Sequence, residues 1–215
     1  GKNILITGGR GFLGRYFMGV FNYLNENLFT HPANIYIIDN FITSGKLGED
    51  LPQYENITYI NHDVIKPLDK EIDCKLDFVI HAAGIASPFY YRAHPMETLD
   101  VATTGTKNML ELALKHNARF TFFSSSEIYG DPDPHYIPIP DVSIAGPRSC
   151  YDISKRLGET LCYIYHTNFG LHTNVIRPFN IFGPGMQAND YRVLPNFASN
   201  IQKNQRLKIY ATGNQ

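Results

Sequence analysis

A tyrosine and a lysine four residues apart are the side chains of this sequence best suited to move a proton. Tyr151 and Lys155 stand in the stretch YDISK, inside a segment with the apolar spacing of a helix. Residues at i and i+4 share one face of a helix, so the phenol and the ammonium group would be neighbours. A nearby cation favours phenolate, and we expect Lys155 to lower the pKa of Tyr151. Such a phenol can take a proton from a hydroxyl while hydride leaves the adjoining carbon. Taken alone, the spacing is equally compatible with an ordinary amphipathic helix.

A second reactive group lies where an apolar run gives way to the loop SSSEIYG. The run ends in Ser124, Ser125 and Ser126, and Glu127 follows directly. Hydroxyls and a carboxylate at the end of a strand are suited to hold a substrate. The carboxylate of Glu127 could instead cap the loop by accepting backbone N–H groups.

A glycine motif, ITGGRGFLGR, follows the first apolar run. Gly8 allows a tight turn, Gly11 lets the backbone approach a pyrophosphate, and Gly14 lets the next helix pack closely. The N-terminus of that helix offers free N–H groups to phosphates. Asp39, at the end of the next apolar run, is placed to hydrogen-bond an adenosine ribose. Its charge would repel a 2′-phosphate, which favours NAD over NADP, whereas Arg10 and the nearby Lys46 act in the opposite direction.

Alternating apolar runs and helical patterns must position these groups. The runs predict strands at 2–7, 34–39, 57–61, 77–83, 119–125 and 172–179, and helices at about 13–24, 95–116 and 151–168. Continuous apolar strands separated by helices indicate an α/β fold, a parallel sheet covered on both faces. We expect a doubly wound Rossmann domain over residues 1–180. Residues 181–215, with a short helix and the run LKIYATG, would form part of a small substrate lobe that is incomplete as given.

Composition excludes several classes of function. The 215 residues are 43% hydrophobic and carry 19 basic and 20 acidic side chains, so nothing favours nucleic acid or a membrane as partner. Cys74, Cys150 and Cys162 are odd in number and widely spaced, which is typical of reduced thiols in a cytoplasmic protein. The eight histidines show no ligand spacing, so we expect no metal.

Together these motifs resemble the extended short-chain dehydrogenase/reductase family, NAD-dependent enzymes of nucleotide-sugar metabolism. The resemblance covers the whole chain: TGGRGFLG at 7–14, DNF at 39–41, HDV at 62–64, HAA at 81–83, SSSEIYG, YDISK and RPFNIFGP at 177–184. Within the family, the stretches INHDV, ASPFYY, SEIYGDP and GPRSCYD are most similar to the corresponding sequences of the UDP-glucuronate decarboxylases (UDP-xylose synthases).

The resemblance implies a role for each matching position. The catalytic group would be Ser125, Glu127, Tyr151 and Lys155. A nucleotide-sugar substrate, with a UDP-sugar favoured, would meet Tyr90, Tyr91, Asn180 and Arg192. The NAD contacts would be Gly8, Gly11, Phe12, Leu13, Asp39, Asn40, Phe41, Ser44, Gly45, Asp63, Val64, Ala82, Ala83, Ala86, Tyr151, Lys155 and Arg177.

The residue before Glu127 separates the chemistries of the family. By resemblance, members that dehydrate sugars place an Asp there to protonate the departing hydroxyl, and this chain has Ser126. Simple 4-epimerases usually carry no carboxylate at this point. A Ser-Glu pair is the decarboxylase pattern, in which oxidation at C4 suffices because the resulting β-keto acid loses CO2 readily. Glu127 would orient the ring or position the water that reprotonates C5.

Two features depart from the decarboxylase pattern. Asp100 and Ala102 stand where the decarboxylases carry Lys and Asn, and Asp100 would repel a glucuronate carboxylate if it faced the pocket. The chain also stops at ATGNQ, where the family continues with an arginine-bearing segment and further helices.

Three functions therefore remain open. The leading prediction is an NAD-dependent UDP-glucuronate decarboxylase, and the second is a 4-epimerase or 4,6-dehydratase of another nucleotide sugar. The third is a non-catalytic NAD sensor, which would have no need of Ser125, Tyr151 and Lys155. The resemblance also implies a homodimer that pairs the predicted helices 95–116 and 151–168 into a four-helix bundle. Apolar residues that face the protein's own core would give the same sequence pattern in these helices.

Overall fold

The computed structural model describes residues 1–45, 53–68, 72–130, 146, 148–187, 190, 192–207 and 209. In this part of the chain, no helix is both long enough and apolar enough to cross a membrane.

Six parallel strands form one sheet in the order β3-β2-β1-β4-β5-β6. The order reverses direction between β1 and β4, the point at which ligands bind in open α/β sheets. Ile6 at the centre pairs with Ile37 on one side and Ile80 on the other. The strands are β1 (Asn3–Thr7), β2 (Asn34–Asp39), β3 (Ile57–Asn61), β4 (Phe78–His81), β5 (Arg119–Phe123) and β6 (Thr173–Ile176).

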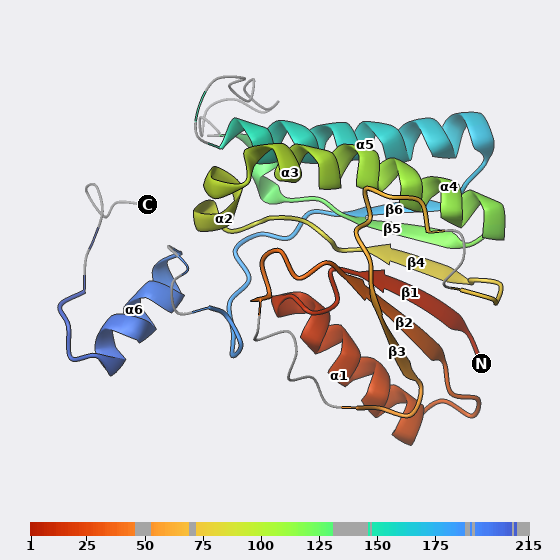
Figure 1. Ribbon diagram of the computed structural model, residues 1–215, viewed down its shortest axis with the longest axis horizontal. Helices are drawn as coiled ribbons and strands as arrows, with labels where there is room; N and C mark the ends of the chain where they lie inside the picture. Colours follow the sequence, from red (N-terminus) through yellow and green to blue (C-terminus); the bar gives the residue numbers. More distant parts are fainter. Residues whose placement is uncertain are drawn as a thin grey trace.

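Helices cover both faces of this sheet, as the apolar strands predicted. Helix α1 (Phe12–Asn27) lies on one face, and α4 (Thr106–His116) and α5 (Ser149–Phe169) lie on the other (Figure 1). A core cluster around Leu5, Leu110 and Phe122 fills the α4–α5 side. A second cluster around Ile6, Met18 and Ile37 fills the α1 side. The prediction of a doubly wound Rossmann fold is confirmed.

The helix predicted at 95–116 is in fact three consecutive segments. It comprises α3 (Pro95–Asp100), a π-helical turn η2 (Val101–Gly105) and α4. The pattern analysis did not predict α2 (Pro88–Ala93) or the 3-10 turn η3 (Ser126–Tyr129). A six-residue helix and a single turn are too short to show a hydrophobic period.

Strand β6 differs from its prediction as a covered strand. Its last three residues are exposed, with Val175 at 39% and Ile176 at 43% of their full accessibility, so apolar sequence did not imply burial here. Helix α6 (Val193–Gln202) follows and lies away from the sheet (Figure 1). Most of the run LKIYATG lies outside the described residues. The division at residue 180 stays a prediction.

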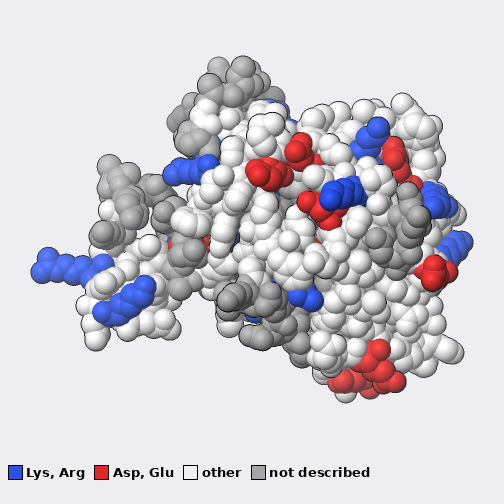
Figure 2. All heavy atoms as spheres, in the orientation of Figure 1, with Lys and Arg blue, Asp and Glu red and all other residues white. Residues whose placement is uncertain are grey.

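Charged side chains of both signs are interspersed over the face shown in Figure 2. Several are paired locally, as in the contact of Lys2 Nζ with Asp77 Oδ1 at 2.7 Å. This mixture agrees with the near-neutral net charge of the sequence.

Candidate active site

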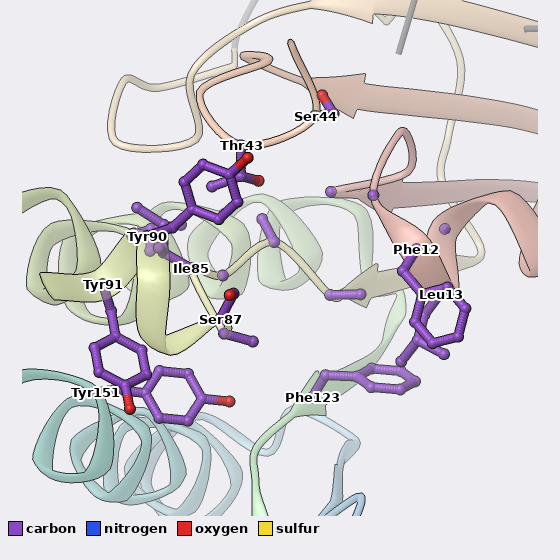
Figure 3. A pocket seen from close by; sticks show the side chains of 18 of the residues that line it. Phe12, Leu13, Thr43, Ser44, Ile85, Ser87, Tyr90, Tyr91, Phe123 and Tyr151 are labelled. Atoms are coloured by element: carbon purple, nitrogen blue, oxygen red, sulfur yellow. The ribbon is translucent and has the colours of Figure 1, made fainter. Parts of the chain in front are cut away.

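A cavity of about 420 Å³ lies at the carboxyl ends of the central strands. Its wall is formed by the loops after β1, β2 and β3 and by the segment after β4. Residues of α2 and α3, the end of β5, the start of α5 and the segment after β6 complete it. Figure 3 shows Phe12 and Leu13 at one side, Thr43 and Ser44 above, and Tyr90, Tyr91 and Tyr151 at the other side. Elements far apart in sequence thus meet in one cavity.

The glycine loop has the geometry that its motif predicts. Gly8 has φ +70°, and a Cβ on it would come within 2.7 Å of the Ala83 Cα atom. A Cβ on Gly14 would come within 2.4 Å of the Gly9 backbone, so α1 starts in direct contact with the loop. Among the described residues, no side chain caps α1 and no acid lies in its first turn. Its N–H groups are therefore available for an anion.

Asp39 lies at the end of β2, and the loop holds its carboxylate. Oδ2 accepts the Arg10 N–H at 3.0 Å and Oδ1 accepts the Phe41 N–H at 2.8 Å. Next to it, the Asn40 amide donates to Asp63 Oδ2 at 3.1 Å, which ties the loop after β2 to the loop after β3. All the predicted adenosine-side residues except Phe41 and Gly45 line the cavity.

Ser125, Tyr151 and Lys155 come together at the other side of the cavity. All three are buried, at 7%, 7% and 3% exposure. Lys155 Nζ donates to the Phe123 carbonyl at 2.7 Å and lies 5.8 Å from the centre of the Tyr151 ring. The i, i+4 spacing on α5 therefore gives the proximity that the sequence predicted.

The expectation that the pKa of Tyr151 is lowered was wrong. The pKa of Tyr151 is raised, because burial penalises the phenolate, and Glu127 and Asp152 raise it further. A hydrogen bond with Ser125 opposes this shift. Lys155 is itself fully buried, and burial lowers its pKa to about 8. In this state the hydroxyl of Ser125 and the charge of Arg192 favour the phenolate.

Among the described residues, no backbone N–H donates to the Glu127 carboxylate, so it does not cap its loop there. The Glu127 N–H donates to Ser125 Oγ at 3.2 Å, so Ser125 is the cap of the turn. The carboxylate lines the cavity and pairs with Arg148, Nη1 to Oε2, at 3.2 Å. Arg148 was not predicted, although its place three residues before Tyr151 puts both at the start of one helix.

The segment after β6 reaches across the cavity. Tyr90 donates to Gln187 Oε1 at 2.5 Å, and Gln187 Nε2 donates to the Thr43 carbonyl at 2.8 Å. Tyr91 stacks on Tyr151 with ring centres 5.6 Å apart. The Asn180 and Arg192 side chains also line the cavity, and the Arg192 guanidinium pairs with buried Asp190. The sequence analysis assigned no role to Gln187 or Asp190.

Three predicted cofactor residues do not line the cavity: Phe41, Gly45 and Arg177. The prediction for Arg177 is not supported, since its guanidinium is bound elsewhere. It donates to Glu159 Oε1 at 2.9 Å and to the Tyr129 hydroxyl at 2.7 Å. Arg177 follows the last residue of β6, and the acid on α5 holds its side chain against that helix.

His81 belongs to a buried network behind the site. Its Nδ1 lies 2.7 Å from Thr7 Oγ1, and its Nε2 lies 3.1 Å from Thr106 Oγ1. Thr7 Oγ1 also accepts the Ala83 N–H, so its hydroxyl hydrogen is free to point at His81. Burial lowers the pKa of His81 to about 3, and the ring is neutral. The network fixes the ends of β1 and β4 against the start of α4.

The cavity has the features that a dinucleotide requires. Ser44, Ser87 and Ser124 line it, and the described residues provide no hydrogen-bond partner for their buried hydroxyls. Buried polar groups without partners are rare in native structures, and a polar ligand would satisfy these three. The glycine loop and the open start of α1 supply the pyrophosphate site.

The comparison with known families agrees with this arrangement. The NAD dependent epimerase/dehydratase family matches residues 4–215. This chain belongs to that family. Its cofactor is NAD, which the glycine loop, Asp39 and the unpartnered serines of the cavity are suited to hold.

Similar sequences carry one recurring name. UDP-glucuronic acid decarboxylase 1 of Xenopus tropicalis is 41% identical over 100% of this chain and 49% of its own length. UDP-glucuronic acid decarboxylase 4 of Arabidopsis thaliana is 36% identical over 99% of this chain and 46% of its own length. The chain spans about half the length of these curated relatives.

Solved structures of epimerases share the fold. Epimerase Mth375 of Methanothermobacter thermautotrophicus superposes with a TM-score of 0.79 at 31% identity, over 99% of this chain and 62% of that one. UDP-glucuronic acid 4-epimerase of Bacillus cereus, in complex with NAD, gives a TM-score of 0.81 at 21% identity, over 99% and 67%. At that identity the likeness of the second structure concerns the fold alone.

Proposed function

We propose that this protein decarboxylates UDP-glucuronate to UDP-xylose through transient oxidation at C4 of the sugar. One observation carries the proposal: Ser125, Glu127, Tyr151 and Lys155 line the same end of a cavity whose other end is built for a dinucleotide. The family membership and the decarboxylase names of similar sequences support it.

Each residue has a task that its surroundings allow. Tyr151 takes the proton of the C4 hydroxyl, helped by the hydrogen bond with Ser125. Lys155 stands beneath the ring and supplies positive charge as the phenolate forms. NAD, when bound, supplies the acceptor and later the donor of the C4 hydride. Tyr91, stacked on Tyr151, holds the phenol in place.

Decarboxylation follows from the position of the ketone. A ketone at C4 lies β to the C6 carboxylate, so the electrons of the breaking C5–C6 bond pass into the carbonyl and CO2 departs. C5 then needs a proton. Glu127, held by Arg148 at the cavity wall, positions the water that delivers it. Reduction of the ketone completes the change from uronic acid to pentose.

A second candidate is a 4-epimerase acting on a neutral nucleotide sugar. Glu97 and Asp100 both line the cavity, and their charges disfavour a carboxylate placed next to them. An epimerase needs the same proton and hydride transfers at C4 but no departing carboxylate.

The experiment that separates these functions is product analysis. The complete protein is incubated with NAD and, in separate reactions, with UDP-glucuronate or with a neutral UDP-hexose. Release of CO2 and formation of UDP-xylose and of the 4-epimer of each sugar are measured. Tyr151→Phe is expected to reduce turnover by at least about a hundredfold while keeping the fold, since removing a general base typically costs 10²–10⁴. Tyr23→Phe, an exposed tyrosine on α1, is the control. A 4-epimer without CO2 would favour the second candidate, and unchanged turnover in Tyr151→Phe would contradict the mechanism.

We also propose a homodimer and a cytoplasmic location. Leu157, Tyr163 and Ile164 are exposed apolar residues on α5, which lies beside α4 and offers a face for a second copy. The molecular mass in solution can be measured by analytical ultracentrifugation at micromolar protein concentration. A mass equal to that of one chain would contradict the dimer. The three cysteines are unpaired, in keeping with a reducing compartment, and localisation of a tagged protein in cell fractions tests this.

A further inference from the structure

Arg10 is a cation at the adenosine end of the cavity that pairs with no acid among the described residues. Its guanidinium lies 4.2 Å from the centre of the Phe41 ring and 5.2 Å from that of Tyr59. Two aromatic faces hold the plane of a guanidinium while leaving its N–H edges free. A fixed cation with free donors is a binding group for an anion.

Phe41 is held in an uncommon conformation that brings its ring under Arg10. Its φ is +62°, in the left-handed region that bulky side chains rarely adopt. Two hydrogen bonds maintain it, from the Phe41 N–H to Asp39 Oδ1 at 2.8 Å and from the Gly45 N–H to the Phe41 carbonyl at 3.0 Å. The ring does not line the cavity, whereas Arg10 does, so the ring contributes to the site by positioning Arg10. Strain of this kind persists where the surrounding structure requires it.

Asp39 stands beside this cation, and its charge is partly neutralised. Each of its carboxylate oxygens already accepts a backbone N–H, from Arg10 and from Phe41. A carboxylate has about four lone-pair sites, so Asp39 can still accept a ribose hydroxyl. The loop therefore presents an acceptor for a hydroxyl and a donor for a phosphate at the same ribose.

We propose that the site accepts NADP as well as NAD, and that Arg10 is the residue that makes this possible. The guanidinium receives the 2′-phosphate, whose oxygens match its paired N–H groups. Asp39 receives the 2′-hydroxyl when that phosphate is absent. This proposal rests on the cofactor site of the proposed function and is independent of the sugar that is processed.

The test measures dissociation constants for NAD and NADP by calorimetry, on the complete protein freed of bound nucleotide. We expect NADP to bind, and Arg10→Ala to raise the ratio of the NADP constant to the NAD constant by at least about tenfold, the effect of losing a hydrogen bond to a charged group. Arg10→Lys keeps the positive charge but lacks the paired N–H groups of the guanidinium. Its ratio should therefore lie between that of the unchanged protein and that of Arg10→Ala. Asp39→Asn is the matched control, and it should lower the ratio. The backbone N–H of residue 10 that holds Asp39 is present in every variant.

The outcomes separate this inference from the proposed function. NAD binding without NADP binding, or a rise of less than about tenfold in Arg10→Ala, overturns the inference and leaves the proposed function standing. Failure to bind either dinucleotide overturns both. Circular dichroism confirms that each variant is folded before its constants are compared.

Discussion

At the scale of single residues, burial governs the charges around Tyr151. Asp152, the next residue on α5, is 4% exposed, and its Oδ1 atom has no hydrogen-bond partner among the described residues. Burial, and to a lesser extent the nearby Glu127, raise its pKa to about 6, against the opposing effect of Arg148. The carboxylate thus lies close to the phenol at a cost in stability.

This cost gives a prediction with a definite sign. The unfolded chain releases the Asp152 proton near pH 3.9, whereas the folded chain holds it to about pH 6, so the penalty is complete above pH 6 and absent below about pH 4. Asp152→Asn should raise the free energy of unfolding by about 1–2 kcal/mol at pH 7.5 and by nothing at pH 4.

Urea unfolding at the two pH values measures the difference. Asp73→Asn, at an exposed position, is the control and should change neither value. A stabilisation that is equal at both pH values would show that ionisation of Asp152 is not its source.

At the scale of elements, the start of α1 depends on a close approach of two backbones. A Cβ on Gly14 would meet the Gly9 backbone at 2.4 Å, and backbone cannot move aside as a flexible side chain can. Gly19, one and a half turns later on the same helix, has nothing within 4 Å of its would-be Cβ. On this one helix, Gly14 therefore has no room for a side chain, whereas Gly19 has room for one.

Alanine at these two positions should have opposite effects. Gly14→Ala should lower the free energy of unfolding by about 1–3 kcal/mol through overpacking, and weaken NAD binding because α1 shifts from the loop. Gly19→Ala should raise it by about 0.5–1 kcal/mol, since alanine loses less entropy in a helix. Thermal unfolding and NAD titration measure both. A stable Gly14→Ala variant with normal affinity would refute the close-approach argument.

At the scale of the whole molecule, a single side chain joins three parts of the chain across the cavity. Gln187 links Thr43, in the loop after β2, to Tyr90 on α2. Tyr16 on α1 adds a bond to the Pro184 carbonyl at 2.9 Å, so the segment 183–187 is attached at both ends. A reaction that oxidises and then reduces the same sugar requires a cofactor that stays bound between the two steps. We expect this segment to restrain the exit of the cofactor.

Removing the link should speed cofactor release. Gln187→Ala loses two hydrogen bonds of roughly 0.5–1.5 kcal/mol each, so we expect NAD to dissociate about ten times faster. Stopped-flow displacement of bound NAD measures the rate. Gln202→Ala, on the exposed face of α6, is the control. Equal release rates in the two variants would show that the segment does not retain the cofactor.

The sequence by itself determined the frame and the parts of the site that depend on short spacing. The β2 and β3 bounds were predicted without error, the Rossmann fold followed from apolar runs separated by helices, and the proximity of Tyr151 and Lys155 followed from the pitch of α5. Each of these depends on local geometry, which a few consecutive residues encode.

Only the tertiary structure decided the electrostatics and the contacts between distant segments. The pKa of Tyr151 is set by burial rather than by Lys155, Arg177 is held by Glu159 rather than by the cofactor site, and Gln187 bridges residues more than 90 positions away. Burial and partner choice depend on what packs around a side chain from elsewhere in the fold. No spacing within a motif carries that information, because charges and hydrogen bonds act through space and not along the chain.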